Sequence, residues 1–257
     1  MPYKEPNHEV IRKLILQSKN KEVVKRDFVL NRSDMKNVVI IPARGGSKRL
    51  LNKNTMLLGG IPLLVHSIAY AKNNQDIVDE IYVSTDDLLI KKIAMEHGVK
   101  VIDRPTNIAG DLEPTITALQ HVLQSIEHEV ANVIVLQPTN PLRPENLLKE
   151  AFAKFKCNRS ASLFTVSRNE HKLGNIVEDR FIPMNYKAGQ RSQDLAPLYF
   201  ENGLLYICEA KQIVKGEIMN KSSLPFVVNH IFAAVDIDTQ DDFDYAEYLF
   251  QKLLKTN

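Results

Sequence analysis

From residue 37 onward, short apolar segments rich in β-branched residues alternate with segments whose apolar residues follow a helical spacing. The sequence predicts strands over 38–42, 79–87, 99–103 and 160–167, and another that begins at 132. It predicts helices over 61–74, 88–98, 114–127 and 144–155. Repeated strand–helix units of this length indicate an α/β protein with a mostly parallel sheet and helices on both faces.

The rhythm changes after Ser167. Residues 171–189 are typical of a hairpin that turns at Glu178 and Asp179, and we place this insert at about 168–190. Strands over 202–209 and 229–238 and a closing helix over 239–255 are predicted next. A projecting hairpin has a face that a second copy could cover, so we expect a homodimer.

Residues 1–36 differ from the rest of the chain. Val10, Ile11, Leu14 and Ile15 have helical spacing, which predicts an N-terminal helical extension ahead of a domain at 37–257. The extension either packs on the domain surface or binds a partner.

The charge balance restricts the kinds of ligand. A net charge of +2 over 257 residues gives no bulk attraction for nucleic acids or membrane surfaces, so we expect neither as a partner. Cys157 and Cys208 have no metal-binding spacing, which favours a reducing compartment. No apolar stretch approaches the ~20 residues that span a bilayer, and residues 1–10 do not resemble a signal peptide. We therefore expect a cytoplasmic protein.

A cationic loop, residues 43–54, follows the first predicted strand. Gly45 and Gly46 let backbone N–H groups approach a ligand. Its four cations can contact several phosphate oxygens: Arg44, Lys48, Arg49 and Lys53. Neither GxxxxGK[ST] nor GxGxxG is present. Because ligands bind at the carboxyl ends of parallel strands, the loop is either a triphosphate site or a solvated basic turn.

Two aspartates near the C-terminus form a second candidate site. Asp236 and Asp238 are two residues apart on a predicted strand, so their side chains face the same side, with Cα atoms roughly 6.6 Å apart. They could share one Mg²⁺. An aspartate within an apolar strand also requires a partner. The alternative is that they are turn or cap residues before the last helix, which suits Asp241, Asp242 and Asp244 better.

Several motifs occur in a characteristic order: "IPARGGSKR…NKN", "VSTDD", "RP…A.D", "LQPTNPLR", "R.QDL", "NG.LYI" and "DIDT". Through them, residues 37–257 resemble the N-acylneuraminate cytidylyltransferases and their relatives that activate other nonulosonic acids. The resemblance implies a three-layer, Rossmann-like nucleotidyltransferase fold with a projecting dimerisation hairpin. It also implies transfer of CMP from CTP to the anomeric hydroxyl of a nonulosonic acid, with release of pyrophosphate.

The resemblance implies a role for individual residues. Nucleotide contacts are Ala43, Arg44, Gly45, Gly46, Ser47, Lys53, Asn54, Asp86 and Gln137. Sugar contacts are Arg104, Thr115, Gln137, Lys172, Arg191 and Tyr206, with Lys172 donated across a homodimer interface. Arg44, Lys53, Asp236 and Asp238 are the implied catalytic residues, and the two aspartates hold Mg²⁺, for which Mn²⁺ could substitute.

The sequence departs from the family pattern at two places. Leu50 and Leu51 stand where proline is frequent, and "DLEPT" places Thr115 where serine is common. The acceptor therefore stays open among sialic, legionaminic, pseudaminic and related acids. The alternatives are a nucleotidyltransferase for Kdo or one that uses GTP, and a catalytically silent nucleotide-binding subunit. An NAD-dependent enzyme lacks support without the glycine fingerprint.

Overall fold

The computed structural model describes residues 35–254. The predicted helical extension lies, up to residue 34, outside the described residues. Residues from Met35 onward form one compact unit. None of the helices in this described range is long and apolar enough to cross a membrane.

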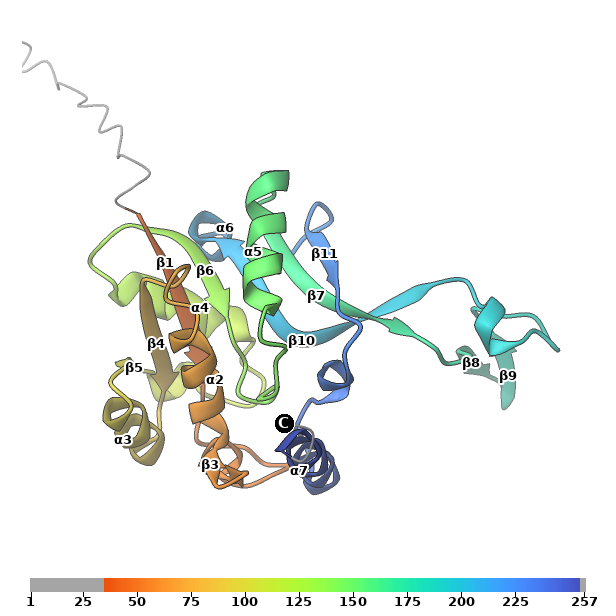
Figure 1. The fold of residues 1–257 in the computed structure, drawn as a ribbon, viewed down its shortest axis with the longest axis horizontal. Coiled ribbons are helices and arrows are strands. Elements are labelled where there is room, and N and C mark those ends of the chain that lie inside the picture. The colour runs from red at the N-terminus through yellow and green to blue at the C-terminus, as the bar shows by residue number, and fades with distance from the viewer. Residues whose placement is uncertain (1–34, 255–257) are drawn as a thin grey trace, which may run out of the picture. The chain divides into compact units, whose positions relative to one another are not determined.

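A seven-stranded sheet in the order β11-β7-β10-β6-β1-β4-β5 forms the centre of this unit (Figure 1). The strands are β1 (Lys36–Pro42), β4 (Glu80–Thr85), β5 (Lys100–Asp103), β6 (Val130–Val135), β7 (Ser162–Asn169), β10 (Leu198–Glu209) and β11 (Leu224–Val227). β10 runs antiparallel to both of its neighbours, and the other pairs in this sheet are parallel. The predicted, mostly parallel sheet is therefore confirmed.

Helices cover both faces, as predicted. They are α2 (Leu63–Lys72), α3 (Leu88–Glu96), α4 (Thr115–Ser125), α5 (Leu147–Asn158), α6 (Ala210–Val214) and α7 (Gln240–Leu254). Along β1, Val39 and Ile41 pack with α2, α3 and α5, whereas Val38 and Ile40 pack with α4 and α6. All four residues are fully buried, which explains why this strand reads as a continuous apolar run. Each contributes on the order of 1.5–3 kcal/mol of burial free energy.

The strand predicted over 229–238 is wrong. Ile231–Ala234 forms a 3-10 helix, η4, which begins where His230 Nδ1 accepts a hydrogen bond from the Phe232 N–H (3.2 Å). The edge strand of this region is instead β11, which the sequence did not predict. The short helix α6 and the hairpin of β2 (Leu57–Leu58) and β3 (Ile61–Pro62) were also missed.

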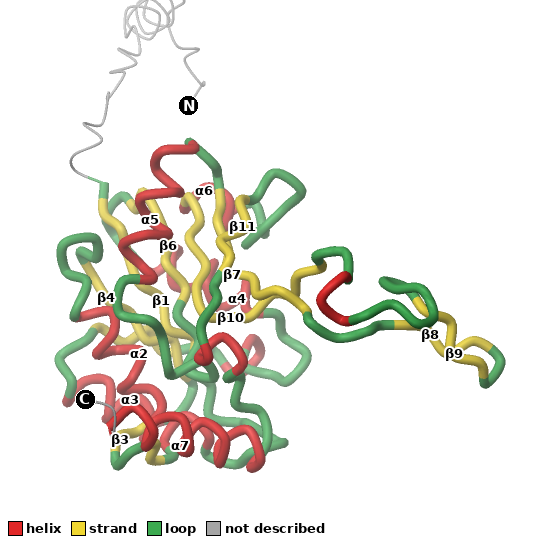
Figure 2. The backbone as a smooth tube through the Cα atoms, turned by 45° about the vertical axis from the view of Figure 1, so that its right-hand side comes forward, coloured by secondary structure: helices red, strands yellow, loops and turns green. Residues whose placement is uncertain are grey.

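The segment between β7 and β10, residues 170–197, is called the arm. It contains the hairpin of β8 (Gly174–Val177) and β9 (Arg180–Pro183), whose central turn residues, Glu178 and Asp179, have φ values of 49° and 58°. Such left-handed residues match the twist of a two-residue hairpin, and the predicted turn position is confirmed. The arm extends away from the sheet (Figure 2).

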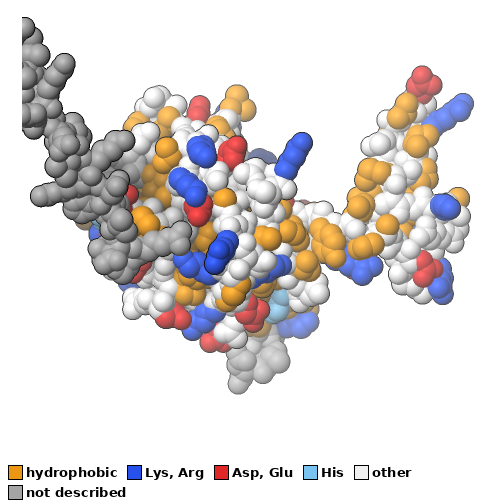
Figure 3. All heavy atoms as spheres, turned by 90° about the horizontal axis from the view of Figure 1, so that it is seen from above, with side chains coloured by type: hydrophobic (Ala, Val, Ile, Leu, Met, Phe, Trp, Pro, Cys, Tyr) orange, Lys and Arg blue, Asp and Glu red, His pale blue; other side chains and the backbone are white. Residues whose placement is uncertain are grey.

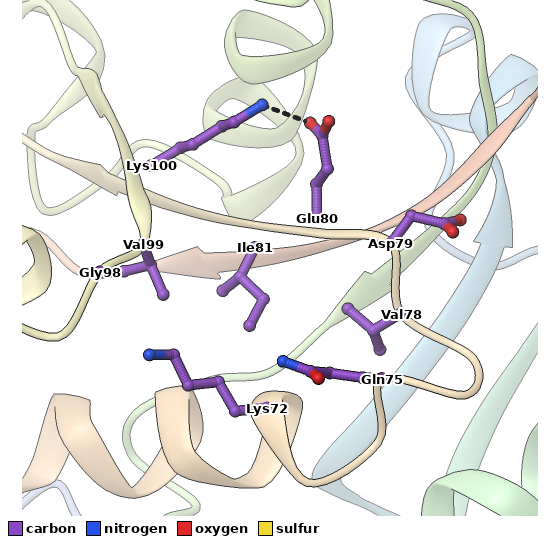
Figure 4. A pocket seen from close by; sticks show the side chains of 9 residues that line it. All are labelled: Lys72, Gln75, Val78, Asp79, Glu80, Ile81, Gly98, Val99 and Lys100. Carbon is purple, nitrogen blue, oxygen red and sulfur yellow. Dashed lines mark hydrogen bonds and ion pairs between the residues drawn. The ribbon is translucent and has the colours of Figure 1, made fainter.

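A cavity of about 450 Å³ lies at the amino-terminal ends of β4 and β5, beside the end of α2 (Figure 4). Its lining residues are Lys72, Gln75, Val78, Asp79, Glu80, Ile81, Gly98, Val99 and Lys100. Ligands of parallel sheets bind at the carboxyl ends of strands, so this cavity lies at the wrong edge for the predicted chemistry.

The Glu80 carboxylate at this edge is a centre of charge. It accepts hydrogen bonds from Lys100 (2.8 Å), Lys36, the Tyr82 hydroxyl and His128. Removal from water would raise the pKa of Glu80, but these donors outweigh that effect and hold the pKa well below its usual range. Together they join the ends of β1, β4 and β5 to the segment before β6.

We expect Glu80→Gln to lower the free energy of unfolding at pH 7 by about 1–3 kcal/mol, because two ammonium groups lose their counter-charge. A depressed carboxyl pKa stabilises the fold above the unfolded-state pKa of about 4.3, and this contribution disappears as the pH falls. Denaturant unfolding at pH 7 and pH 3 should therefore show a difference between wild type and variant that shrinks in acid. An equal difference at both pH values would contradict the assignment.

Candidate active site

Four polar segments meet at the carboxyl edge of the sheet. The cationic loop follows β1, Asp86 follows β4, Arg104 follows β5, and Gln137 follows β6 by two residues. Because β5, β4, β1 and β6 are adjacent and parallel, these strand exits lie side by side. The four polar exits therefore converge at one edge of the sheet.

The beginning of the cationic loop is held by backbone contacts. The Gly45 N–H donates to Asp86 Oδ1 (3.0 Å), and a Cβ at Gly45 would lie 2.7 Å from the Asp87 Cβ, so only glycine fits. Asp87 itself caps α3 by accepting from two backbone N–H groups. Gly46 has open space around it. Asn54, a predicted nucleotide contact, is buried and donates to the Arg44 carbonyl (2.9 Å), which fixes the shape of the loop.

Carboxylates from two other segments hold the cations of the loop. Asp111, in the connection before α4, contacts Arg44 Nη1 and Lys48 Nζ, both at 2.7 Å. These two cations lower the pKa of Asp111, Lys48 contributing more. Asp238 contacts Lys53 Nζ (2.8 Å) and Arg49 Nη2 (2.7 Å). The loop is therefore an organised cationic surface with internal counter-ions.

Lys53 is the least exposed of the paired cations. Its side chain is 12% exposed, and its ammonium also donates to the Ile237 carbonyl (2.8 Å). Lys53 opens the 3-10 helix η1 (Lys53–Thr55) directly after Asn52, which has a left-handed φ of 54°. The sequence positions 53 and 238 are thus joined by direct contact.

Asp236 and Asp238 lie on an extended segment that pairs with no strand. Val235 and Ile237 are buried, whereas Asp236 is exposed. Buried and exposed side chains therefore alternate as in a strand, although the segment does not join a sheet. The predicted strand around Asp236 is therefore wrong, whereas the expected partner is present, because the Thr139 side chain forms a hydrogen bond with the Asp236 carboxylate. The segment is held by the loop after β6, because the Ile237 N–H donates to the Thr139 carbonyl (2.8 Å).

Two other acidic residues near the pair have structural partners. Asp242 Oδ2 accepts from the N–H groups of Asp238 (3.0 Å) and Thr239 (2.8 Å), as expected for an acidic residue in the first turn of the last helix. Asp244 accepts from Gln240 Nε2. Asp242 thus fixes the backbone that presents Asp238.

The two candidate carboxylates influence each other. The surrounding protein removes water from the Asp236 carboxyl, which raises its pKa, and a hydrogen bond from Thr139 partly offsets this. Repulsion from the Asp238 carboxylate raises the pKa further. Among residues 35–254, no group of three or more His, Cys, Asp or Glu side chains forms a complete metal site. Two hard oxygen donors suit Mg²⁺ when phosphate oxygens complete the set.

Arg104 is a buried cation at the same edge. Its Nε donates to Ser84 Oγ (3.1 Å) and its Nη2 to the Ser84 carbonyl (2.8 Å). Burial lowers the pKa of Arg104, Asp86 opposes this, and Arg44 adds to it, so the three charged groups are neighbours. Thr115 is the first residue of α4 and is half-buried, and Pro114 precedes it without a side-chain cap.

Tyr206 is buried in the middle of β10, and its hydroxyl donates to Glu201. Burial raises the pKa of Tyr206, and the Glu201 and Asp236 carboxylates add to this rise. The hydroxyl predicted to contact the sugar is therefore already engaged near Asp236. The sequence did not predict that Glu201 is the partner of Tyr206, because no motif marks this residue.

Lys172 and Arg191 lie on the arm. The Lys172 ammonium is 5.1 Å from the centre of the Tyr186 ring, and Arg191 pairs with Asp194 through contacts of 2.8 and 3.1 Å. Because the arm extends away from the sheet, one chain does not bring these two residues to the carboxyl edge (Figures 1 and 2).

Comparisons with known proteins agree on one group. The family model described as "Cytidylyltransferase" matches residues 38–255. The chain is 35% identical over 228 residues to the pseudaminic acid cytidylyltransferase of Campylobacter jejuni subsp. jejuni serotype O:23/36 (strain 81-176), covering 84% of this chain and 97% of that protein. It is 32% identical over 233 residues to the CMP-N,N'-diacetyllegionaminic acid synthase of Legionella pneumophila subsp. pneumophila (strain Philadelphia 1), with the same two coverages.

A solved structure of CMP:2-keto-3-deoxy-manno-octonic acid synthetase complexed with CTP has a similar fold. The TM-score is 0.64 at 19% identity, covering 84% of this chain and 99% of that one. The predicted Rossmann-like nucleotidyltransferase fold is confirmed by this likeness.

Proposed function

This chain belongs to the cytidylyltransferase family, and from that premise we propose that it transfers CMP from CTP to the anomeric hydroxyl of a nonulosonic acid. The observation that carries the proposal is the contact of the cationic loop with Asp238 at the carboxyl edge, through Lys53 and Arg49. This contact supports the proposal, because it joins cations that would bind phosphate to a carboxylate that would hold a metal ion. The names of the similar proteins support a nonulosonic acid as the acceptor.

The triphosphate would bind on the cationic loop. Phosphate oxygens would replace the Asp111 carboxylate as the partner of Arg44 and Lys48, since the same geometry suits both anions. Open space at Gly46 allows close approach of phosphate to the backbone. Of the other implied nucleotide contacts, Ala43 and Ser47 lie within the same loop, and Gln137 lies at the adjacent exit of β6.

Asp236 and Asp238 would hold Mg²⁺ together with phosphate oxygens. When bound, the ion would neutralise charge that accumulates on the leaving pyrophosphate. For this, Lys53 and Arg49 must shift from Asp238 to the triphosphate, which is the direction in which the incoming negative charge draws them.

The acceptor carries a carboxylate, for which Arg104 is the candidate partner on this chain. Two of its N–H groups are used on Ser84, and the guanidinium has further donors in a planar fork. In the transfer, the anomeric oxygen forms a bond to the α-phosphorus, the bond from that phosphorus to the bridging oxygen breaks with its electron pair on the departing pyrophosphate, and the hydroxyl proton passes to water. Positioning and charge neutralisation then account for most of the catalysis.

Pyrophosphate release tests this function. The purified protein is incubated with Mg²⁺, CTP and, separately, pseudaminic, legionaminic, N-acetylneuraminic and Kdo acids, with GTP replacing CTP as the control. We expect release with CTP and at least one nonulosonic acid, and none with GTP. Release that occurs only with GTP would overturn the proposal. Failure of every acid in the panel to give release with CTP would overturn it as well.

A homodimer is part of the proposal. The arm exposes a run of apolar side chains (Figure 3): Ile176, Val177, Phe181, Ile182 and Met184. A second copy is the occupant that suits this apolar hairpin, because dimerisation would also give Lys172 and Arg191 a route to an active site.

We expect sedimentation to show a dimer at micromolar concentration. Ile176→Glu should produce a monomer, because Ile176 is 78% exposed on the hairpin. Leu88→Glu, at an apolar residue 83% exposed on α3, is the matched control and should remain dimeric. A monomeric wild type, or a dimer that survives Ile176→Glu unchanged, would contradict the assignment of this face.

A further inference from the structure

Arg143 is a buried arginine at the end of the loop that follows β6. Its side chain donates to three acceptors: the Leu204 carbonyl through Nε (2.7 Å), Ser67 Oγ through Nη1 (3.1 Å) and the Gln137 carbonyl through Nη2 (2.8 Å). The residue is 7% exposed. It therefore joins α2, β10 and the carboxyl end of β6.

The acceptors around Arg143 are all neutral. Among the described residues no carboxylate forms an ion pair with it, and the Tyr70 ring lies 5.7 Å from the guanidinium carbon. Burial lowers the pKa of Arg143 to about 10, so the group stays charged at neutral pH. A buried charge without a counter-ion destabilises a fold by several kcal/mol relative to an apolar residue. Packing alone therefore does not account for an arginine here.

The contacts of Arg143 fix a turn at the candidate site. The Gln137 carbonyl accepts from Arg143 and also from the Asn140 N–H (3.2 Å), which closes the turn 137–140. With its backbone carbonyl directed to Arg143, the half-buried Gln137 lies at the exit of β6, where the nucleotide and the sugar would meet.

The same turn carries the aspartate segment. Asn140 Nδ2 donates to the Val235 carbonyl (2.8 Å), and the Thr139 carbonyl accepts from the Ile237 N–H (2.8 Å). Both bonds flank Asp236. A displacement of the turn would thus move Gln137 and the backbone of the proposed metal ligands together, relative to the cationic loop.

We propose that Arg143 is a positioning residue for the nucleotidyl transfer, which holds the turn 137–140 and through it sets Gln137, Asp236 and Asp238 against the cationic loop. This rests on the proposed function of the site. Arg143 touches no reacting atom in this scheme, and its effect is geometric. Displacements on the order of 1 Å can reduce a rate by about 100-fold.

Kinetics of two variants test the role. Arg143→Met keeps an apolar chain of similar length and removes every donor, whereas Arg143→Lys keeps a charge that can reach the Gln137 carbonyl. We expect Arg143→Met to lower kcat by about 10–100-fold with a much smaller change in the KM for CTP, and Arg143→Lys to recover part of the loss. Asn132→Ala is the matched control: it removes a buried side-chain bond to Asn37 at the opposite edge, so stability should fall and kcat should stay.

Amide hydrogen exchange tests positioning without turnover. Arg143→Met should accelerate exchange at 137–140 and at Ile237 and leave β1 unchanged. Unchanged exchange there, or a folded Met variant with wild-type kcat, would overturn the proposal. Should the Met variant not fold, the same two measurements on Arg143→Lys decide. If the wild type releases no pyrophosphate, the proposed function is refuted separately. Hydrogen exchange tests the positioning role by itself, because it does not depend on turnover.

Discussion

Lys53→Ala is expected to lower pyrophosphate release at saturating CTP by about 100-fold or more, with the fold intact. Removing one preorganised group that stabilises developing charge has an effect of this size. Lys53 is the least exposed cation of the cationic loop, and its contact with Asp238 shows that it reaches the same point as the candidate metal ligands. Initial rates over a range of CTP concentrations give kcat and KM separately.

Lys154→Ala is the control for Lys53. Lys154 lies on the remote helix α5 and, like Lys53, donates to a backbone carbonyl, that of Pro225 (2.8 Å). The Lys154→Ala variant should retain wild-type rates. If Lys53→Ala also turns over at the wild-type rate, Lys53 is a structural residue that ties η1 to the segment before α7, and the triphosphate assignment is wrong.

Asp236→Asn and Asp238→Asn are each expected to lower kcat by at least about 100-fold and to weaken Mn²⁺ binding in the presence of CTP. The amide keeps the shape and loses the charge. Asp236→Asn should leave the fold intact, because it relieves repulsion from Asp238. Asp238→Asn removes the counter-charge of Lys53 and Arg49 and should lower stability without unfolding the protein, since Asp238 is only partly buried. Mn²⁺ binding, followed by electron paramagnetic resonance, reports on the site without turnover, and chelator should abolish wild-type activity.

Asp241→Asn provides the comparison within the same region. Asp241 is an exposed residue in the first turn of α7 and is not part of the proposed pair. Its rate and its Mn²⁺ affinity should equal those of the wild type. Wild-type Mn²⁺ affinity in both pair variants would place the metal elsewhere and leave Asp236 and Asp238 as residues of the segment before α7.

The sequence predicts most of the sheet because its parallel strands are buried on both faces. Val38 to Ile41 form a continuous apolar run for that reason, and Gly98, with a φ of 62°, ends α3 where the sequence placed the end. The error at 229–238 has a physical reason as well. The apolar–polar alternation of Val235, Asp236 and Ile237 shows only that one side of an extended segment is buried. An extended segment that pairs with no strand has the same pattern.

The contacts that organise the site depend on tertiary structure. Asp111 stands within "DLEPT", and nothing local indicates that it would pair with Arg44 and Lys48, more than 60 positions away. Arg143 ends the motif "LQPTNPLR", whose resemblance indicates a functional loop without indicating which side chain points inward. Residue types at strand exits can be read from a sequence, whereas their pairings require the folded chain.

The arm begins and ends at one paired position of the sheet. Asn169 at the end of β7 is paired with Leu198 at the start of β10, so the two ends of the arm are neighbours. The entropic penalty of closing such a loop grows only logarithmically, by about 0.6 kcal/mol for each doubling of length. The sheet therefore tolerates arms of very different length and sequence, and the proposed dimer contact can diverge while the register of β7 and β10, and with it the edge that carries the candidate site, stays the same.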